Sequence, residues 1–395
     1  MQIQTKYGPV HVLTACPLLS STETLEFLTE VHESYNGSED RNNLRDRPRQ
    51  ILNFNYVNFK KAMGDMFHML FANLRGLWGI PLKQCAQDLP SVDGDFISFD
   101  TSRNLSDLNL GYAFIQSKTE NLVVEIISIG RTVQNGVDEN DEPIFEYEDG
   151  FQLSEAITID NATICPLRVC IIDNDVAISA GGFWANQQIS FRVLAEDMPE
   201  IDGLEPAQFL NEDIYFKCLL LEGDSLSMTL TQNQIIVDGD IGGFQDFTNW
   251  KNPRYLKPFR SVLSNEFEYF DYKSFLYRRL GKYKAFWLPL YEQHLNTVSA
   301  GANWIDVDND YVTEADRKHI AVKINDIWSA HTITDKVQSV GKVRLSITPA
   351  LNATLSQVQS LCYLGLYRLA ADTAEFSFLG ARKAQVNIPI VELNS

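Results

Sequence analysis

The stretch LYRRLGKYKAFWLPLYEQHL, residues 276–295, has a weaker copy earlier in the chain, LFANLRGLWGIPLKQCAQDL, residues 70–89. In each copy a helix-like segment ends at a glycine, Gly76 or Gly281, the residue type that most often follows the end of a helix. A short apolar and aromatic run follows. A proline closes that run, because proline cannot donate to a strand ladder. The order of helix, glycine and edge strand is therefore predicted twice.

Apolar and polar residues alternate with a period of two around both copies, which predicts strands. ILNFNYV at residues 51–57 and NEFEYFDY at residues 265–272 are each predicted to form a strand that leads into the helix. Asn58 is expected to cap the first helix and Asp271 the second. The first helix is expected to be the longer one.

Further weak matches follow in the same order, and together they indicate an internal duplication. We interpret the chain as mainly β with short helices, built from two related β-sandwich or barrel-like units. The first unit is predicted at residues 51–195, with an acidic insert at 137–150, and the second at residues 251–395. Residues 1–50 are predicted to form an N-terminal arm, and residues 196–250 a linker region.

The chain has 395 residues and a net charge of −19. This charge argues against general nucleic-acid binding, because phosphates are repelled by an acidic surface. The same surface suits a nucleic acid that must slide past without sticking. No apolar run approaches the roughly 18 residues of a membrane span, and no signal peptide is expected. The six cysteines form no CxxC pair, so we expect them to be reduced.

Two basic stretches stand out on this acidic chain, Arg41 to Arg49 and Arg278 to Lys284. Such stretches can meet the acidic face of a neighbouring copy, and head-to-tail contacts of this kind close rings. They can equally form salt bridges to carboxylates of their own chain. Both interpretations stay open.

No group of residues in the sequence predicts catalysis. DVDNDYVTEADR, residues 306–317, has the spaced aspartates of a calcium loop, but Tyr311 replaces the required glycine and Arg317 the required glutamate. The six histidines form no metal-ligand pair, and no phosphate loop or nucleophile motif occurs. We therefore expect no enzyme activity, no metal and no cofactor.

Two blocks resemble a family of tail-tip proteins of long, non-contractile-tailed bacteriophages. LEFLTEVHESYNGSEDRNNLRDRPRQ, residues 25–50, is similar to the opening block of that family, and FLYRRLGKYKAFWLPLYEQHL, residues 275–295, to a later one. Asn36, Ser38 and His294 depart from the family pattern. The resemblance covers most of the chain in order. It implies a distal tail protein in the ring that joins the tail tube to the hub or baseplate and the fibres.

The resemblance also implies partners and a location. The protein would be assembled in the host cytoplasm and reside in the virion as a homo-hexameric ring, beside the tail tube, tape-measure, hub and tail-fibre proteins. DNA would pass through the lumen without specific binding. The residues expected to contact other subunits or partners are Tyr35, Arg41, Arg45, Arg49, Arg278, Arg279, Phe286, Trp287 and Tyr291.

Other functions stay open. The chain can be a trimeric baseplate hub rather than the ring above it. It can also be a saccharide-binding β-sandwich module for host attachment, with Trp78, Trp184 or Trp304 exposed to the sugar. A hydrolase acting on the host envelope would need a carboxylate pair or metal site that the sequence does not show.

Overall fold

The structure is a computed structural model, and the part of the chain that it describes forms 28 β-strands and two α-helices. The prediction of a mainly β fold with short helices is confirmed. The described residues are 1–19, 21–34, 36–98, 108–137, 143–198, 201, 206–217, 227–238, 240, 242–247, 250, 253–308, 317–351, 353–380 and 383–393.

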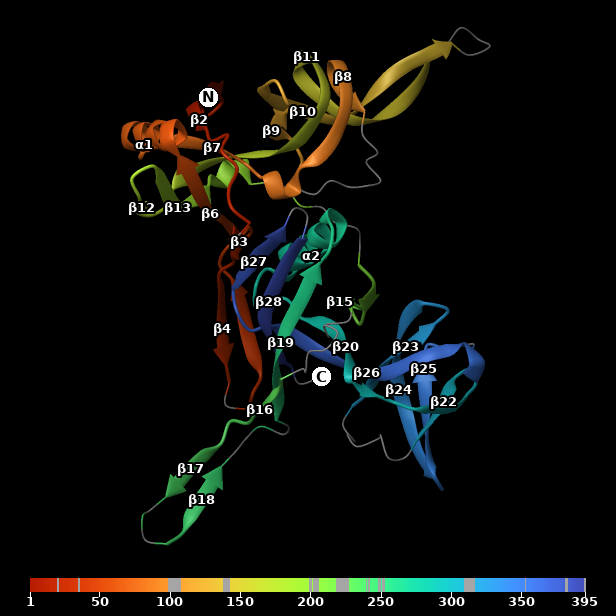
Figure 1. Cartoon of the computed structure of the whole chain (residues 1–395). Coiled ribbons are helices and arrows are strands. Elements are labelled where there is room, and N and C mark those ends of the chain that lie inside the picture. Colours follow the sequence, from red (N-terminus) through yellow and green to blue (C-terminus); the bar gives the residue numbers. More distant parts are fainter. Residues whose placement is uncertain are drawn as a thin grey trace.

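The N-terminal half, residues 1–198, contains one of the two helices; most of it lies at the top of Figure 1, and its β4 strand extends down beside the C-terminal half. Its elements are β1 (Gln2–Thr5), β2 (Gly8–Val12), β3 (Thr22–Glu26), β4 (Thr29–Glu33), β5 (Glu39–Asn43), β6 (Arg49–Phe59), α1 (Lys60–Asn73), β7 (Leu77–Pro81), β8 (Gln87–Ser98), β9 (Gly111–Gln116), β10 (Asn121–Val137), β11 (Pro143–Ile172), β12 (Ala177–Ala180) and β13 (Trp184–Val193).

The C-terminal half, residues 206–393, lies below it and contains the second helix. Its elements are β14 (Gln208–Phe209), β15 (Glu212–Ile214), β16 (Thr229–Thr231), β17 (Ile235–Asp238), β18 (Phe244–Phe247), β19 (Arg254–Leu263), α2 (Glu266–Arg279), β20 (Phe286–His294), β21 (Thr297–Ala300), β22 (Trp304–Asp308), β23 (His319–Ile324), β24 (Ile327–Ser339), β25 (Lys342–Thr348), β26 (Val358–Leu369), β27 (Thr373–Gly380) and β28 (Lys383–Glu392).

The central strands of the two halves pair in the same order. In the N-terminal half the antiparallel order is β7, β11, β13, β6, and in the C-terminal half it is β20, β26, β28, β19. A short strand joins each group in parallel, β2 beside β7 and β15 beside β20. A hairpin strand extends each group, β12 beside β13 and β27 beside β28.

The outer strands repeat as well. In the N-terminal half β8 pairs with β11, and the first part of β11 also pairs with β10. The β10 strand pairs with β9, and β9 pairs with the last part of β11. In the C-terminal half the corresponding order is β22, β25, β24, β23, β26. This common order supports the predicted duplication, which itself stays a prediction.

The segments predicted as an arm and a linker have parallel roles in the two halves. Residues 1–50 contribute β1 to β5 and the start of β6, and β3 pairs with β6. Residues 196–250 contribute β14 to β18, and β16 pairs with β19 in the same way. Within the predicted N-terminal arm, β1 to β3 are hydrogen-bonded to strands of the sheet, and the arm itself stays a prediction. The predicted unit boundaries stay predictions.

The two helices have equal lengths of 14 residues, which corrects the expected difference. The predicted strand at residues 265–272 is helical. The Asn265 side chain accepts a hydrogen bond from the Glu268 backbone amide and starts α2 six residues before Asp271, the expected cap. The α1 helix starts without a side-chain cap, and the Asn58 side chain donates to Gln187 instead.

The largest cluster of buried apolar side chains contains residues of both halves. A separate cluster fills the space between β8, β9, β10 and β11. Because the largest cluster is shared, the two halves are packed together around common apolar residues.

The acidic insert predicted at 137–150 is in part the β10–β11 hairpin, where Arg131 faces Glu148. Residues 138–142 of the insert lie outside the described chain.

Candidate functional site: the junction between the two halves

A single strand joins the two halves into one sheet. One edge of β3 pairs with β6 of its own half, where Glu26 faces Arg49, and the other edge pairs with β27 of the C-terminal half, where Glu26 faces Thr373. Backbone hydrogen bonds therefore cross from one half to the other. Figure 1 shows β3 beside β27 at the level where the halves meet.

A buried charge pair lies behind this strand. The Nζ atom of Lys273, on α2, is 2.7 Å from Oε1 of Glu23, on β3, and both side chains are fully buried. Gln50 donates to Oε1 of Glu23 at 2.9 Å, and the Tyr269 hydroxyl donates to its Oε2. Buried charges need such partners, because removing an ion from water costs several kcal/mol. The pair holds α2 against a strand of the other half.

The C-terminal end of α2 also lies in the junction. Thr29 donates from its hydroxyl to the Leu280 carbonyl at 3.1 Å, and from its backbone amide to Asp372 at 3.0 Å. Gly281 has a φ of +68°, and a Cβ atom there would collide with Asp372 and Phe27. Glycine is therefore required at this position both for its backbone conformation and for the close approach of the other half.

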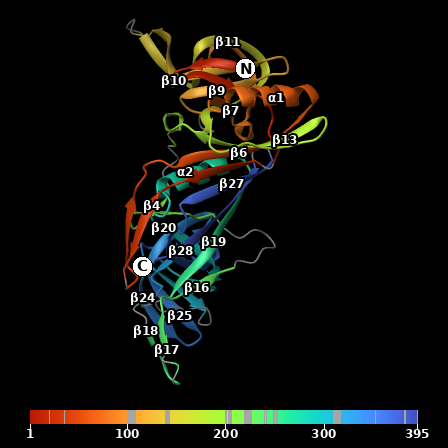
Figure 2. The ribbon, with the colours of Figure 1, turned by 90° about the vertical axis from the view of Figure 1, so that its left-hand side faces the viewer.

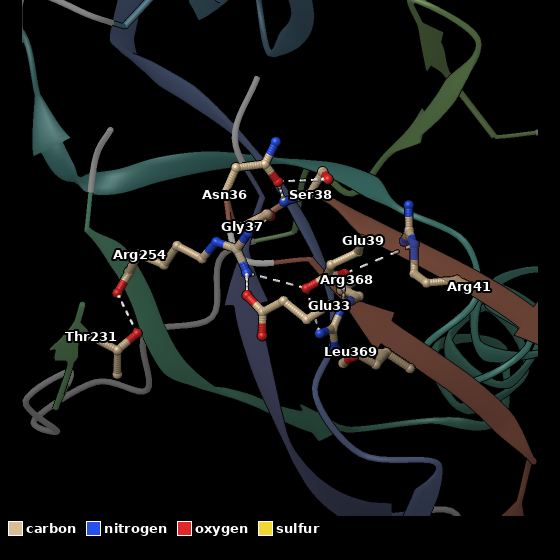
Figure 3. Close-up of polar contacts among 10 residues, drawn as sticks. All are labelled: Glu33, Asn36, Gly37, Ser38, Glu39, Arg41, Thr231, Arg254, Arg368 and Leu369. Atoms are coloured by element: carbon tan, nitrogen blue, oxygen red, sulfur yellow. Dashed lines mark hydrogen bonds and ion pairs between the residues drawn. The ribbon is translucent and has the colours of Figure 1, made fainter. Parts of the chain in front are cut away.

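The β4–β5 hairpin crosses onto the C-terminal half through a cluster of ionic contacts (Figure 3). Arg368, on β26, donates to both carboxylate oxygens of Glu39, at 2.6 and 2.8 Å. Arg254, at the start of β19, donates to Glu33 at 2.9 Å and to Glu39 at 3.2 Å. The Glu39, Arg254 and Arg368 side chains are at most 11% exposed, so solvent screens these contacts little.

The turn of this hairpin brings it close to Arg254. Asn36 accepts hydrogen bonds from the amide and hydroxyl of Ser38, and Gly37 between them has a φ of +82°. The Gly37 carbonyl accepts from Arg254, whose guanidinium stacks 4.3 Å from the Trp250 ring centroid. This turn belongs to the first block that resembles the tail-tip family.

The pKa of Glu39 is lowered from its ordinary value. Burial acts in the opposite direction and would raise this pKa, but the hydrogen bonds from Arg368 and the positive charges of Arg254 and Arg41 outweigh it. The carboxylate is therefore charged at neutral pH.

The predicted arginines of the first block are partly involved in the junction. Arg41 lies 3.9 Å from Glu39, and Arg45 donates to the Glu26 carbonyl at 2.8 Å. Arg49 is exposed at the start of β6. Tyr35 lies outside the described residues.

The predicted residues of the later block make contacts inside the C-terminal half. Arg278 lies 3.0 Å from Asp213, and Arg279 bonds to the same carboxylate. The Trp287 indole donates to the Phe209 carbonyl at 2.8 Å, and the Tyr291 hydroxyl donates to the Phe216 carbonyl. Phe286 is also buried. These five side chains therefore serve the packing of their own half, and the salt-bridge interpretation describes both arginines.

Of the residues that form the junction, Gly281 was predicted as a helix terminator, whereas the charged residues Glu23, Glu39 and Lys273 were not singled out from the sequence. Glu39 and Gly37 stood within the quoted first block, which was the available signal for the hairpin contacts. Lys273 is one of three basic residues in the α2 segment, and Glu23 stands in a short strand. Neither shows its partner by spacing, because the partners are far apart in the chain.

The tryptophans of the saccharide-binding alternative differ in exposure. Trp78 is fully buried, which removes it as a saccharide contact, whereas Trp184 is 39% exposed and Trp304 is half-buried against Arg344. Among the described residues no group of three or more histidine, cysteine or acidic side chains could hold a metal ion. Within the same residues no helix is long and apolar enough to cross a membrane.

In comparisons with known proteins, no family model and no curated sequence matches this chain. The geometry of the junction and the resemblance of the two sequence blocks therefore carry the functional argument.

Proposed function

We propose that this chain is a structural protein of a bacteriophage tail tip, in a ring that joins the tail tube to the hub or baseplate and the fibres. One observation carries the proposal. The two blocks that resemble the tail-tip family meet at the junction, where Thr29 of the first block bonds to Leu280 of the second. These blocks therefore form a contact within the chain between two halves of similar pairing order, and the proposal assigns this contact to a ring component.

The surface charge supports the same role. With a net charge of −19 the ring lumen would repel DNA, so DNA passes without specific binding. Assembly in the host cytoplasm and residence at the virion tail tip follow from this proposal. The tail tube, tape-measure, hub and fibre proteins are its proposed partners.

A trimeric hub is the second candidate, and the repeated pairing order favours it. Each chain offers two halves with the same strand pairing order. Three copies therefore place six similar halves around the ring, and six copies place twelve. A sixfold tube can therefore be continued by three chains. The mass of the ring distinguishes this trimer from the homo-hexamer.

Light scattering on the purified chain, over a range of concentrations and at low and high salt, tests the proposal. A closed ring of three or six times 44.8 kDa is expected. Three copies identify the hub candidate and six the distal tail ring. A monomer at every concentration contradicts the ring, and binding on a glycan array would then favour the saccharide-binding alternative.

A further inference from the structure

The internal junction between β3 and β27 has a counterpart in two strands that each have one unpaired edge within the described chain, β16 and β12. The outer edge of β3 is covered by β27, but among the described residues β16, the counterpart of β3, pairs only with β19. In the same part of the chain β12, the counterpart of β27, pairs only with β13. We propose that β16 of one copy pairs with β12 of the next copy and repeats the β3–β27 junction. This inference rests on the proposed ring and names the surface that closes it.

The pairings fix the register of this contact. Glu26 faces Arg49 and Thr231 faces Arg254, the first residues of β6 and β19, so Thr229 corresponds to Thr24. The same comparison through β13 and β28 makes Ala177 the counterpart of Glu375. Because Thr24 faces Glu375 in the chain, Thr229 is predicted to face Ala177 of the next copy.

The side chains along this register are complementary. Met228, Leu230 and Ile178 are 41%, 55% and 44% exposed in the free chain. They correspond to Glu23, Leu25 and Phe376, which are buried at the internal junction. Exposed apolar residues on an open strand edge favour pairing with another chain. The proposed contact would bury all three.

The buried charge pair has an apolar counterpart. Aligned end to end, the two 14-residue helices match Lys273 with Phe67 and Tyr269 with Met63. Met228 replaces Glu23 in the corresponding strand position. The internal junction therefore joins a carboxylate to an ammonium, whereas the proposed contact joins a thioether to a phenyl ring. Glu23 and Lys273 therefore both have apolar counterparts, Met228 and Phe67, as expected if these two residues touch in the contact between copies.

The helices differ in burial as the proposal requires. The α2 helix has eight buried residues and α1 has two. Part of this difference comes from β3 and its neighbours, since Lys273 contacts Glu23 and Tyr277 contacts Phe27 of the other half. In α1 the counterpart of Tyr277 is Phe71, which is 92% exposed. A neighbouring copy would cover this face.

The hairpins give an independent argument. The β4–β5 hairpin lies on the C-terminal half, whereas its counterpart β17–β18 extends away from the rest of the chain (Figures 1 and 2). All eight strand residues of β17 and β18 are exposed, and most are apolar, including Phe244 at 69% and Ile236 at 58%. Such a surface is costly to leave in water. In the proposed contact it lies on the N-terminal half of the next copy.

The contact is head-to-tail, because one copy supplies β16 and its neighbour supplies β12. Repeating a heterologous contact closes a ring when the rotation permits. Each copy then sits between two neighbours, and the sheet continues around the ring.

Disulfide trapping tests the register. Facing residues of an antiparallel pair have Cα atoms about 4.5–5.5 Å apart, within the range that a disulfide spans. In a background where Cys16 and Cys218 are serine, chains with Thr229→Cys are mixed with chains carrying Ala177→Cys and oxidised. Cross-linked dimers are expected. In the matched control, chains with Thr229→Cys are mixed with chains carrying Ile178→Cys in place of Ala177→Cys. The side chain of residue 178 faces the other side of the sheet, so this mixture should give at least about tenfold less dimer.

A charge exchange tests the side chains. Met228→Glu alone and Phe67→Lys alone should each weaken ring assembly on the order of tenfold, because each leaves a charge in an apolar contact. The double variant recreates the Glu23–Lys273 pair between copies and should recover most of that loss. Val340→Glu changes a fully exposed apolar residue outside the contact and should leave assembly unchanged.

The outcomes separate this inference from the proposed function. A ring by light scattering without dimers from the Thr229→Cys and Ala177→Cys mixture overturns the proposed contact and leaves the ring intact. Dimers from a chain that scatters as a monomer support the contact and contradict a self-assembling ring. Equal dimer yields from Ala177→Cys and Ile178→Cys contradict the register.

Discussion

At the residue scale, the junction depends on a few charged side chains that have no access to water. Glu23 and Lys273 are fully buried, and Glu39 is nearly so. A buried ion pair contributes little net stability against an apolar pair of the same shape, but removing one partner leaves the other charge uncompensated. The free energy of unfolding should therefore respond more to single substitutions than to paired ones.

Lys273→Met is expected to lower the free energy of unfolding by about 3–5 kcal/mol, because it leaves the Glu23 carboxylate buried and unpaired. Adding Glu23→Gln should recover more than half of this loss. Urea unfolding of the three proteins measures both effects. Lys217→Met breaks an ion pair with Asp271 in which both side chains are 47% exposed, and should change the stability by at most about 1 kcal/mol. Equal losses from Lys273→Met and Lys217→Met contradict the role of the buried pair.

Glu39 predicts a pH dependence with a definite sign. Its pKa in the folded chain is lowered below the ordinary value of 4.5, so the folded state favours the ionised form. Its contribution to stability is fully present above pH 4.5 and is lost as the pH falls through the lowered pKa. The difference in unfolding free energy between wild type and Glu39→Gln should therefore shrink below pH 4.5. A difference that stays constant down to acid unfolding would contradict this assignment.

At the scale of elements, both helices and the strands around α1 were predicted in order, but the start of α2 and the strand before it, β19, were not. Period-two alternation in residues 265–272 predicted a strand, while the Asn265 cap and the acidic first turn select a helix. The glycine that follows α2 was predicted correctly as its terminator. Its further role at the junction depends on Asp372 and Phe27, which no local pattern shows.

Gly281→Ala is expected to lower the free energy of unfolding by about 2–3 kcal/mol, because it combines a left-handed backbone with collisions against Asp372 of its own half and Phe27 of the other half. Gly341→Ala is the matched control. Gly341 has a similar φ of +75°, with no heavy atom within 4 Å of the added Cβ, so about 1 kcal/mol is expected. Thermal unfolding of both variants measures the loss of stability in each. The difference between the two losses reports the crowding around the Cβ added at residue 281. The same loss in both would exclude a contribution from crowding.

At the scale of the whole molecule, β3 makes one sheet of two halves. It has neighbours on both edges, whereas β16 has one neighbour in the described chain. Two halves coupled through backbone hydrogen bonds and a shared apolar cluster should unfold together.

Thr24→Pro should uncouple the halves, because proline in a strand with two neighbours removes a backbone donor and distorts the ladder. Urea unfolding followed by fluorescence and circular dichroism is expected to change from one coincident transition to two. Thr229→Pro, at the corresponding position of β16, should leave the single transition of the isolated chain intact. Two transitions in the wild type would show that β3 does not couple the halves.

Local patterns in the sequence predicted the mainly β class, the order of helix, glycine and strand in both halves, and the interpretation of that order as a repeat. These features are local, because periodicity and turn residues act within a few positions of the chain. Tertiary packing alone places β3 beside β27, brings Glu39 to Arg368 at a separation of 329 residues, and leaves β16 and β12 with one paired edge each among the described residues. Backbone hydrogen bonds and ion pairs between distant segments depend on how the whole chain packs. Spacing along the sequence carries no record of that packing.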